Sequence, residues 1–403
     1  MRGTEFLDKM ELVDPMYIEA ADAMPLQQKH VRARWGAAAA CLALLVLAGA
    51  AFLLSKISQT PSDLPMLSIS KNTASMGYEG YMAYDASELV NANPWNENMA
   101  LTTLPVYQNP LTYDGNHIAS GADFEQMEAF LLEVAQRLGL DPNTLTITDD
   151  VPDEETKKQI TEKLELGGGT VPDGYFAPTK LIVQANGIEI QVDQTLTATV
   201  SFDPAIALPE EYHFTHFASL DEITAVAKYL QTQYSAFIGI KNPRLNIHGG
   251  DYDIYARQKY SIEFFDPEGT DTQQIINYNF NRTAFYCNDD GKLFLARIYR
   301  PDLSVKVGDY PIISVEQARE LLAEGSCLTT VPREMPGLEY VKKVELVYRT
   351  GDYETYYMPY YRFYVELPEE KREHGLRDYG AYYVPAIDRA YISNMPTWDE
   401  GFH

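Results

Sequence analysis

The sequence predicts an α+β protein in which a single N-terminal transmembrane helix precedes repeated units, each built from one helix and an antiparallel sheet. Three observations lead to this prediction. One window near the N-terminus is long, apolar and uncharged. After it, a helical pattern is followed by strand patterns three times. The 403 residues are 45% hydrophobic and 22% charged, which fits a globular chain of two or three domains and excludes wholesale disorder and a polytopic membrane protein.

The uncharged window covers residues 35–54, with the sequence WGAAAACLALLVLAGAAFLL. At ~1.5 Å per residue, a helix of this length crosses the ~30 Å core of a lipid bilayer. Lys29, Arg32 and Arg34 precede the window, whereas Lys56 alone follows closely. The positive-inside rule then places the N-terminus in the cytosol and the C-terminal domain outside the cell. We therefore expect a single-pass protein of the cell membrane that contacts the bilayer through residues 35–54.

Two other interpretations of this window stay open. Ala48-Gly49-Ala50 is an acceptable small-residue cleavage site, so the window could belong to a signal peptide that is removed after Ala50. The 34 residues before the window form a longer leader than usual, which favours an uncleaved anchor. The other interpretation is a buried Ala-rich core helix, although soluble helices rarely lack polar residues on every face.

Residues 1–34 form the predicted cytosolic tail. Four of its apolar residues recur at the spacing of one helical face, and Asp14-Pro15 interrupts the pattern, so we expect two short amphipathic helices. This stripe is too small to form a core, which favours binding to a cytosolic partner. A disordered leader that only sets the topology is the alternative. The partner-binding residues would be Phe6, Met10, Val13 and Tyr17.

The segments MELVDPMYIEAAD and WGAAAACLALLVLAG, with a basic patch between them, resemble the leader of a group of Gram-positive bacterial single-pass membrane proteins. Many of these are regarded as anti-sigma factors or signalling ectodomain proteins. Residues 77–110 resemble an element of the same group. The resemblance implies regulation across the membrane, with a sigma factor as the cytosolic partner, and it transfers no active-site residue. The zinc-binding motif His-x₃-Cys-x₂-Cys of one anti-sigma type does not occur in this sequence.

Beyond residue 54, we expect a linker followed by three α+β units. The linker and surface wrap, residues 55–120, is rich in Asn, Ser, Pro and Met and has few periodic apolar runs. The first, second and third units cover residues 121–205, 206–303 and 304–403.

Each predicted unit opens on a helix with a capping residue at its start. Asp123 begins the first helix, near residues 123–138, and Ser219 and Ser314 begin the second and the third, each with a polar residue three positions later. Asn186-Gly187 stands between alternating apolar residues, which predicts a tight hairpin turn in the first unit.

A strand near residues 358–367 places Tyr361, Phe363, Val365 and Leu367 on one face and four polar or aromatic residues, including Glu366, on the other. This alternation predicts an antiparallel sheet with one wet face. Because tyrosine is also favoured at binding surfaces, that face would recognise an unknown envelope ligand. Plain strand propensity, with half of the rings buried, is the alternative. The recognition residues would be Tyr360, Arg362 and Tyr364.

The order of elements in the third unit resembles PepSY-like envelope modules. This resemblance implies an inhibitory or ligand-sensing domain without catalysis. The formal net charge of −26, with no basic stripe, argues against nucleic acid as a partner.

Motifs that would carry chemistry are few. No HExxH, P-loop, G-x-S-x-G or cysteine pair with metal-ligand spacing occurs. Ser68 and Lys71 match the Ser-x-x-Lys pattern, but the Lys-Thr-Gly and Ser-Asp-Asn elements that accompany it are absent. A carboxylate cluster at 149–155 is expected at a helix start. Hard cations favour such oxygen clusters, but the spacing here fits no known calcium loop. Cys287 and Cys327 could form one disulfide or stay as two thiols. We predict no catalytic residue, no metal and no cofactor.

Together these patterns predict a membrane-anchored extracytoplasmic sensing or regulatory protein that is not an enzyme and relays a signal to a sigma factor through its tail. The alternative is an envelope-anchored binding or scaffold protein whose tail serves only as an anchor. A third possibility is an enzyme whose site has no recognisable motif.

Overall fold

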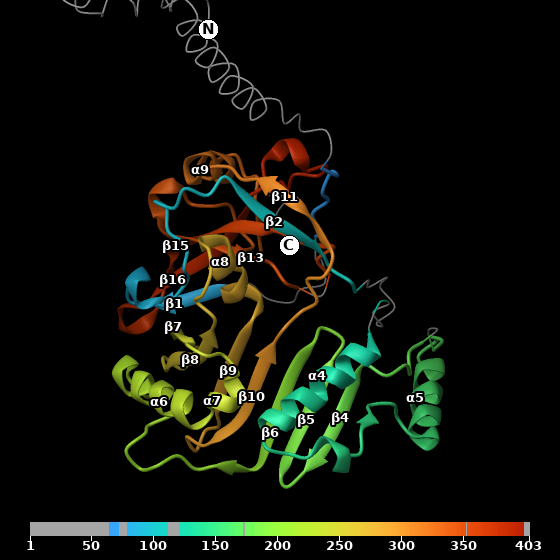
Figure 1. Cartoon of the computed structure of the whole chain (residues 1–403). Coiled ribbons are helices and arrows are strands. Elements are labelled where there is room, and N and C mark those ends of the chain that lie inside the picture. Colours follow the sequence, from blue (N-terminus) through green and yellow to red (C-terminus); the bar gives the residue numbers. More distant parts are fainter. Residues whose placement is uncertain are drawn as a thin grey trace, which may run out of the picture. The chain divides into compact units, whose positions relative to one another are not determined.

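The computed structural model describes residues 64–71, 79–111, 121, 123–171, 174–351 and 353–398. Most of their strands join one antiparallel sheet of 13 strands, in the order β13-β15-β16-β1-β7-β8-β9-β10-β6-β5-β4-β3, with β12 paired to β16 (Figure 1). Its strands are β1 (Gly80–Ala83), β3 (Thr148–Asp149), β4 (Lys180–Ala185), β5 (Ile188–Asp193), β6 (Thr197–Ile206), β7 (Arg244–Tyr252), β8 (Gln258–Phe265), β9 (Arg282–Cys287), β10 (Leu293–Tyr299), β12 (Leu328–Thr329), β13 (Val341–Tyr348), β15 (Pro359–Lys371) and β16 (Arg377–Pro385).

A second sheet of three strands has the order β11-β2-β14. Its strands are β2 (Thr103–Gln108), β11 (Lys306–Pro311) and β14 (Tyr356–Tyr357). The helices are α4 (Phe124–Arg137), α5 (Glu154–Leu166), α6 (Leu220–Gln233), α7 (Ser235–Ile238), α8 (Asp271–Phe280) and α9 (Val315–Ala323).

The predicted fold class, with a transmembrane helix ahead of separate repeated units, is wrong. The described chain is mostly antiparallel sheet, and its strands pair across the predicted unit boundaries: β10 pairs with β6, and β1 pairs with both β16 and β7. Small separate sheets would each leave two unpaired edges. Joining them into one sheet pairs the edge strands at each junction, so fewer edges remain.

The membrane prediction is corrected in the same way. Within the residues that the structure describes, no helix combines the length and the apolar character needed to cross a membrane. The description as a single-pass membrane protein is therefore wrong for this part of the chain. The predicted span, residues 35–54, and the predicted tail, residues 1–34, lie outside the described residues.

The three long helices that follow the strongest capping signals begin where the sequence predicts. The Asp123 side chain accepts a hydrogen bond from the backbone N–H of Gln126, and capping boxes form at Ser219 and Ser314. These caps are local interactions between residues three apart, so a single segment of sequence specifies them. The Asn186-Gly187 turn between β4 and β5 is also confirmed, since both residues have the positive φ that a type I′ turn needs.

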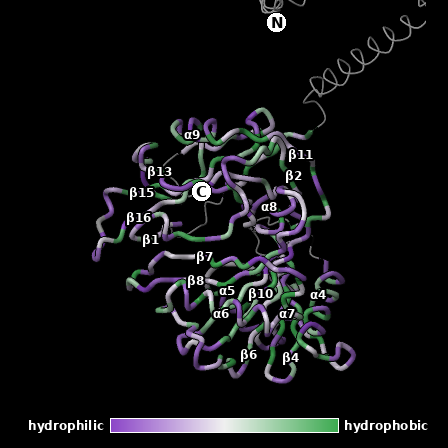
Figure 2. Tube along the Cα trace, turned by 60° about the vertical axis from the view of Figure 1, so that its left-hand side comes forward, coloured by the Kyte–Doolittle hydropathy of each residue, from purple (hydrophilic) through white to green (hydrophobic). Residues whose placement is uncertain are grey.

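The helices α4, α6 and α7 cover one face of the strands β4 to β10. Their shared core contains fully buried side chains such as Phe130, Leu230, Ile262 and Phe285. Hydrophobic and hydrophilic residues alternate along these strands (Figure 2). Because successive side chains of a strand point to opposite faces, the other face of β7 to β10 carries polar residues. These are Asn246, His248, Glu263, Arg282, Tyr286, Arg297 and Tyr299.

Residues 79–111, which fall in the predicted linker, contribute to both sheets. Strand β1 lies between β16 and β7, and β2 is the middle strand of the three-stranded sheet. Gly250 in β7 has a φ of +98°, and a Cβ at this position would lie 1.3 Å from the carbonyl oxygen of Glu88. The chain after β1 therefore packs directly on the backbone of β7.

The replacement Gly250→Ala tests this close approach. Because the new methyl group overlaps the Glu88 carbonyl, the free energy of unfolding should fall by ~2 kcal/mol or more. The control is Gly139→Ala, where φ is +78° and no atom lies within 4 Å of the added Cβ. There only the backbone strain of ~1 kcal/mol should remain. Urea unfolding monitored by circular dichroism would measure both, and equal losses would contradict the packing described here.

Candidate functional site

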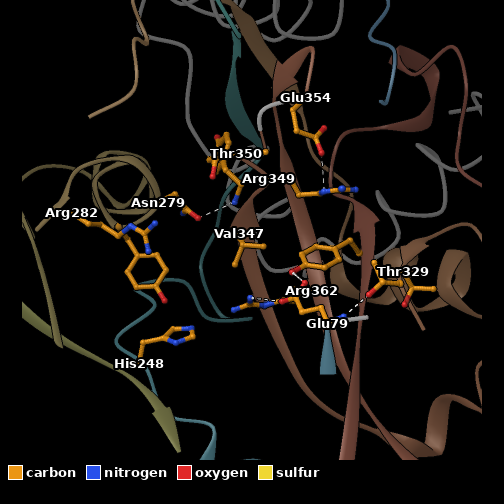
Figure 3. A pocket seen from close by; sticks show the side chains of 15 residues that line it. Glu79, His248, Asn279, Arg282, Thr329, Val347, Arg349, Thr350, Glu354 and Arg362 are labelled. Carbon is orange, nitrogen blue, oxygen red and sulfur yellow. Dashed lines mark hydrogen bonds and ion pairs between the residues drawn. The ribbon is translucent and has the colours of Figure 1, made fainter. Parts of the chain in front are cut away.

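A polar cavity of about 340 Å³ lies where the polar face of β7 and β9 meets strands β15 and β16 and the C-terminal ends of α8 and β13. We call it the arginine cavity. Figure 3 shows Arg282 and His248 on one side of it, and Arg349 and Arg362 on the other. Its charged and titratable lining residues, other than tyrosines, are Arg282, Arg349, Arg362, Glu79, Glu354 and His248.

Arg362 of β15 is the most connected of these side chains. Its Nη2 donates to the Glu345 carboxylate at 2.6 Å, across the neighbouring strand β13, and its Nη1 lies 3.4 Å from Glu79. The guanidinium also stacks on the Tyr364 ring, 5.0 Å from its centroid. Burial alone would raise the pKa of Glu345, but the charges of Arg362 and Lys343 outweigh it and hold the pKa at about 2.

The carboxylate of Glu79 also accepts hydrogen bonds, on both of its oxygens. The hydroxyl groups of Tyr81 and Tyr383 each donate to it at 2.5 Å, one to each oxygen. Burial raises the pKa of both tyrosines, so they stay protonated and act as donors.

On the opposite wall, Arg282 pairs with Glu263 of β8 at 3.1 Å, and Asn246 donates to the same carboxylate at 2.8 Å. The imidazole of His248 forms no hydrogen bond with the residues that the structure describes. Burial lowers its pKa, an effect that the charge of Glu263 partly opposes. A neutral imidazole offers one N–H donor and one acceptor nitrogen to whatever occupies the cavity.

At the rim, Nε of Arg349 lies 3.0 Å from Glu354, and the guanidinium stacks over the rings of Tyr360 and Tyr383, 5.6 Å from each centroid. Burial raises the pKa of Glu354, and the charge of Arg349 only partly opposes this.

Hydrogen-bond donors and acceptors are unequally satisfied around the cavity. The carboxylates of Glu79, Glu263 and Glu345 each accept from two or more donors. In contrast, Arg282 Nε, Arg349 Nη1 and Arg362 Nε are buried without a partner within the described chain. A buried N–H without a partner costs roughly 1–3 kcal/mol, so this cavity favours an occupant that supplies acceptor oxygens.

The hydroxyl groups of two lining threonines are already hydrogen-bonded. Thr329 donates to the carbonyl oxygen of Ala381 at 2.7 Å, and the Thr330 hydroxyl accepts from the Glu79 backbone N–H. Within the described ranges, no group of three His, Cys, Asp or Glu side chains is placed to hold a metal ion. The arrangement can therefore bind and orient an anion.

The predicted recognition residues lie on one face of β15, but this face is not wet. Tyr360 is fully buried and Tyr364 is 2% exposed. Tyr360 packs with Leu67 and its neighbours, and residues 83–89 cover Tyr364. The expected surface for recognition is therefore a buried layer, and of the three residues Arg362 alone lines the cavity. The predicted tail residues Phe6, Met10, Val13 and Tyr17 lie outside the described residues.

The acidic residues noted in the sequence have local structural roles, and the two cysteines of the described chain are unpaired. Asp150 accepts hydrogen bonds from Thr179, and Asp153 caps α5. Cys287 and Cys327 are free thiols, and burial raises their pKa values to about 11 and about 12.

The sequence analysis missed Arg282, Arg349, His248 and Glu79. Two strand sequences could have indicated the site, because Glu263 and Glu345 each interrupt an apolar run. A charge in such a run must have a partner when the strand is buried.

Comparison with known proteins does not assign the chain to a class. No family model matches it, and no curated protein matches it either. The resemblances to anti-sigma factors and to PepSY-like modules therefore stay predictions.

The pairing of Glu345 makes stability depend on pH. Its pKa is about 2 in the folded chain and ~4.3 in an unfolded one, so its contribution is complete above ~pH 4.3 and is lost as the pH falls towards 2. The replacement Glu345→Gln should lower the free energy of unfolding by ~3 kcal/mol at pH 7, and the difference should shrink between pH 5 and about pH 2. Urea unfolding at several pH values would measure this.

The control for this series is Glu128→Gln, on the exposed side of α4. That variant should follow the wild-type curve at every pH. A constant difference between Glu345→Gln and wild type over the whole range would contradict the assigned ionisation of Glu345.

Proposed function

We propose that this chain is a non-catalytic binding protein that recognises a small anionic ligand in the arginine cavity. One observation carries the proposal. Three guanidinium groups that line the cavity each carry a buried N–H without a partner in the described chain, while the carboxylates of Glu79 and Glu345 each accept from two or more donors. A ligand with carboxylate or phosphate oxygens would satisfy these donors.

Two arginine side chains of the cavity are held in fixed orientations. Arg282 and Arg362 are each fixed by an ion pair and by stacking on a tyrosine ring. Donors that are already oriented lose little freedom when a ligand binds, which improves affinity. The volume of about 340 Å³ is at the lower end of the range for small-molecule sites, which fits a small organic acid or phosphate ester.

A sensing role agrees with the position of the cavity. Its walls come from β7 and β9 on one side and from β15, β16 and the residues after β13 on the other. A bound anion would join these segments and stabilise the folded state in proportion to its concentration. The relay to a sigma factor through residues 1–34 stays a prediction, and so does the alternative of a binding or scaffold protein without a relay.

The test is calorimetric titration of the purified full chain with citrate, succinate and inorganic phosphate, comparing wild type with Arg349→Met. Methionine keeps an apolar stem against Tyr360 and Tyr383 and removes the open donor. Because a charge-assisted hydrogen bond contributes ~1.5–3 kcal/mol, we expect the affinity to fall at least ~10-fold.

The matched control is Arg333→Met, which removes a surface ion pair with Glu370 and lies outside the arginine cavity. Its affinity should equal that of wild type. Failure of all three anions to bind, or equal affinities for wild type and Arg349→Met, would refute the proposed function.

A further inference from the structure

A second polar pocket, of about 350 Å³, lies over β4, β5, β6 and β10. Its cationic lining residues are Lys180 at the start of β4 and Arg297 in β10. We call it the Lys180–Arg297 pocket. It shares no lining residue with the arginine cavity.

Arg297 is oriented but not neutralised. Its guanidinium lies over the Tyr286 ring, 5.6 Å from the centroid. Its Nε is buried and has no partner, and no ion pair joins Arg297 to a carboxylate in the described part of the chain. Stacking on an aromatic ring fixes the plane of a guanidinium. Burial alone would lower the pKa of Arg297, but hydrogen bonds with the side chains of Tyr299 and Tyr286 raise it, and its Nε is the atom left without a partner.

Lys180 also lacks an ion pair with any residue that the structure describes. One carboxylate lines the pocket, that of Asp193, and its Oδ1 is occupied by its own turn. It accepts from the N–H and hydroxyl of Thr195 at 2.9 and 2.6 Å and from the N–H of Thr197 at 3.1 Å. Two cations against one carboxylate give the pocket a positive formal charge in a chain whose net charge is −26.

The two sites are separated by a pair of stacked side chains. Arg282, which lines the arginine cavity, lies over the ring of Tyr299, which lines the second pocket, 4.9 Å from its centroid. The hydroxyl groups of Tyr299 and Tyr286 lie 3.1 Å apart and are hydrogen-bonded. Because Arg282 is held by Glu263, this wall does not depend on a ligand in either site.

We propose that the Lys180–Arg297 pocket is a second anion-binding site, which binds a phosphate group. Arg297 supplies its charge and the unpartnered Nε N–H, Lys180 supplies a point charge, and Thr199 adds a hydroxyl group to the same lining. These groups come from three strands, β10, β4 and β6, and both charged groups bind the oxygens of phosphates in proteins. The phosphate is either the free ion or part of a phosphate ester.

The test uses the full chain as wild type, Arg297→Met, Arg349→Met and the double variant. Each is titrated with inorganic phosphate and, separately, with glycerol 3-phosphate, and binding is followed by calorimetry. Arg297→Met should weaken phosphate binding at the second site at least ~10-fold, whether or not Arg349 is present. Tighter binding of glycerol 3-phosphate than of the free ion would identify an ester as the ligand, and the reverse would identify free phosphate.

Two further variants separate charge from geometry. Arg297→Lys keeps the charge and loses the planar fork, so its affinity should lie between those of wild type and Arg297→Met. The control Arg244→Met removes an arginine that stacks on Phe265 and lies outside both sites, and it should bind as wild type does. Thermal unfolding would confirm that each variant is folded.

The outcomes distinguish this inference from the proposed function. Loss of phosphate binding in Arg297→Met with no effect of Arg349→Met supports the second site and refutes phosphate as the ligand of the arginine cavity, for which citrate and succinate remain the test. The opposite pattern refutes the second site and keeps the proposed function. Phosphate binding that is equal in wild type and Arg297→Met, or absent in wild type, would overturn the inference.

Discussion

The ion pair between Arg362 and Glu345 is the interaction on which the centre of the structure depends. It joins β15 to β13, and the same guanidinium reaches Glu79, beside β1, which in turn accepts from Tyr383 of β16. A buried charge without a partner costs several kcal/mol, so each of these groups needs the others in place. The network therefore fixes the relative positions of four chain segments and, with them, one wall of the arginine cavity.

The two proposed sites follow from a common feature of the sheet. Its helix-covered face supplies the hydrophobic core, whereas the opposite face of β7 to β10 is polar and carries stacked arginines and tyrosines. Stacking keeps a guanidinium oriented without neutralising it, which differs from an ion pair. Where a carboxylate is also present, as beside Arg282, the ion pair holds the guanidinium and leaves one N–H without a partner in the described chain. At Arg297 no ion pair to a carboxylate occurs within the described residues.

The sequence predicts local features of this fold well. The caps at Asp123, Ser219 and Ser314 and the Asn186-Gly187 turn depend on residues close together in the chain. Sheet order depends on which distant strands pair, and alternation within one strand carries no information about its neighbours. Alternation also placed Tyr360 and Tyr364 correctly on one face of β15, but it could not show that Leu67 and residues 83–89 cover that face. The cavity was missed for the same reason, because its residues come from segments as far apart as Glu79 and Tyr383.

The position of β1 in the sheet has a consequence for the order of events during synthesis. Both neighbours of β1 are made long after it, β7 at residues 244–252 and β16 at residues 377–385. Ribosomes add ~5–20 residues per second, so β16, the second strand that pairs with β1, is synthesised tens of seconds after β1. The helices α4 and α6 with strands β4 to β10 emerge during that time and can close their own core. Arg362 emerges after all of these elements, so the arginine cavity forms later than this core.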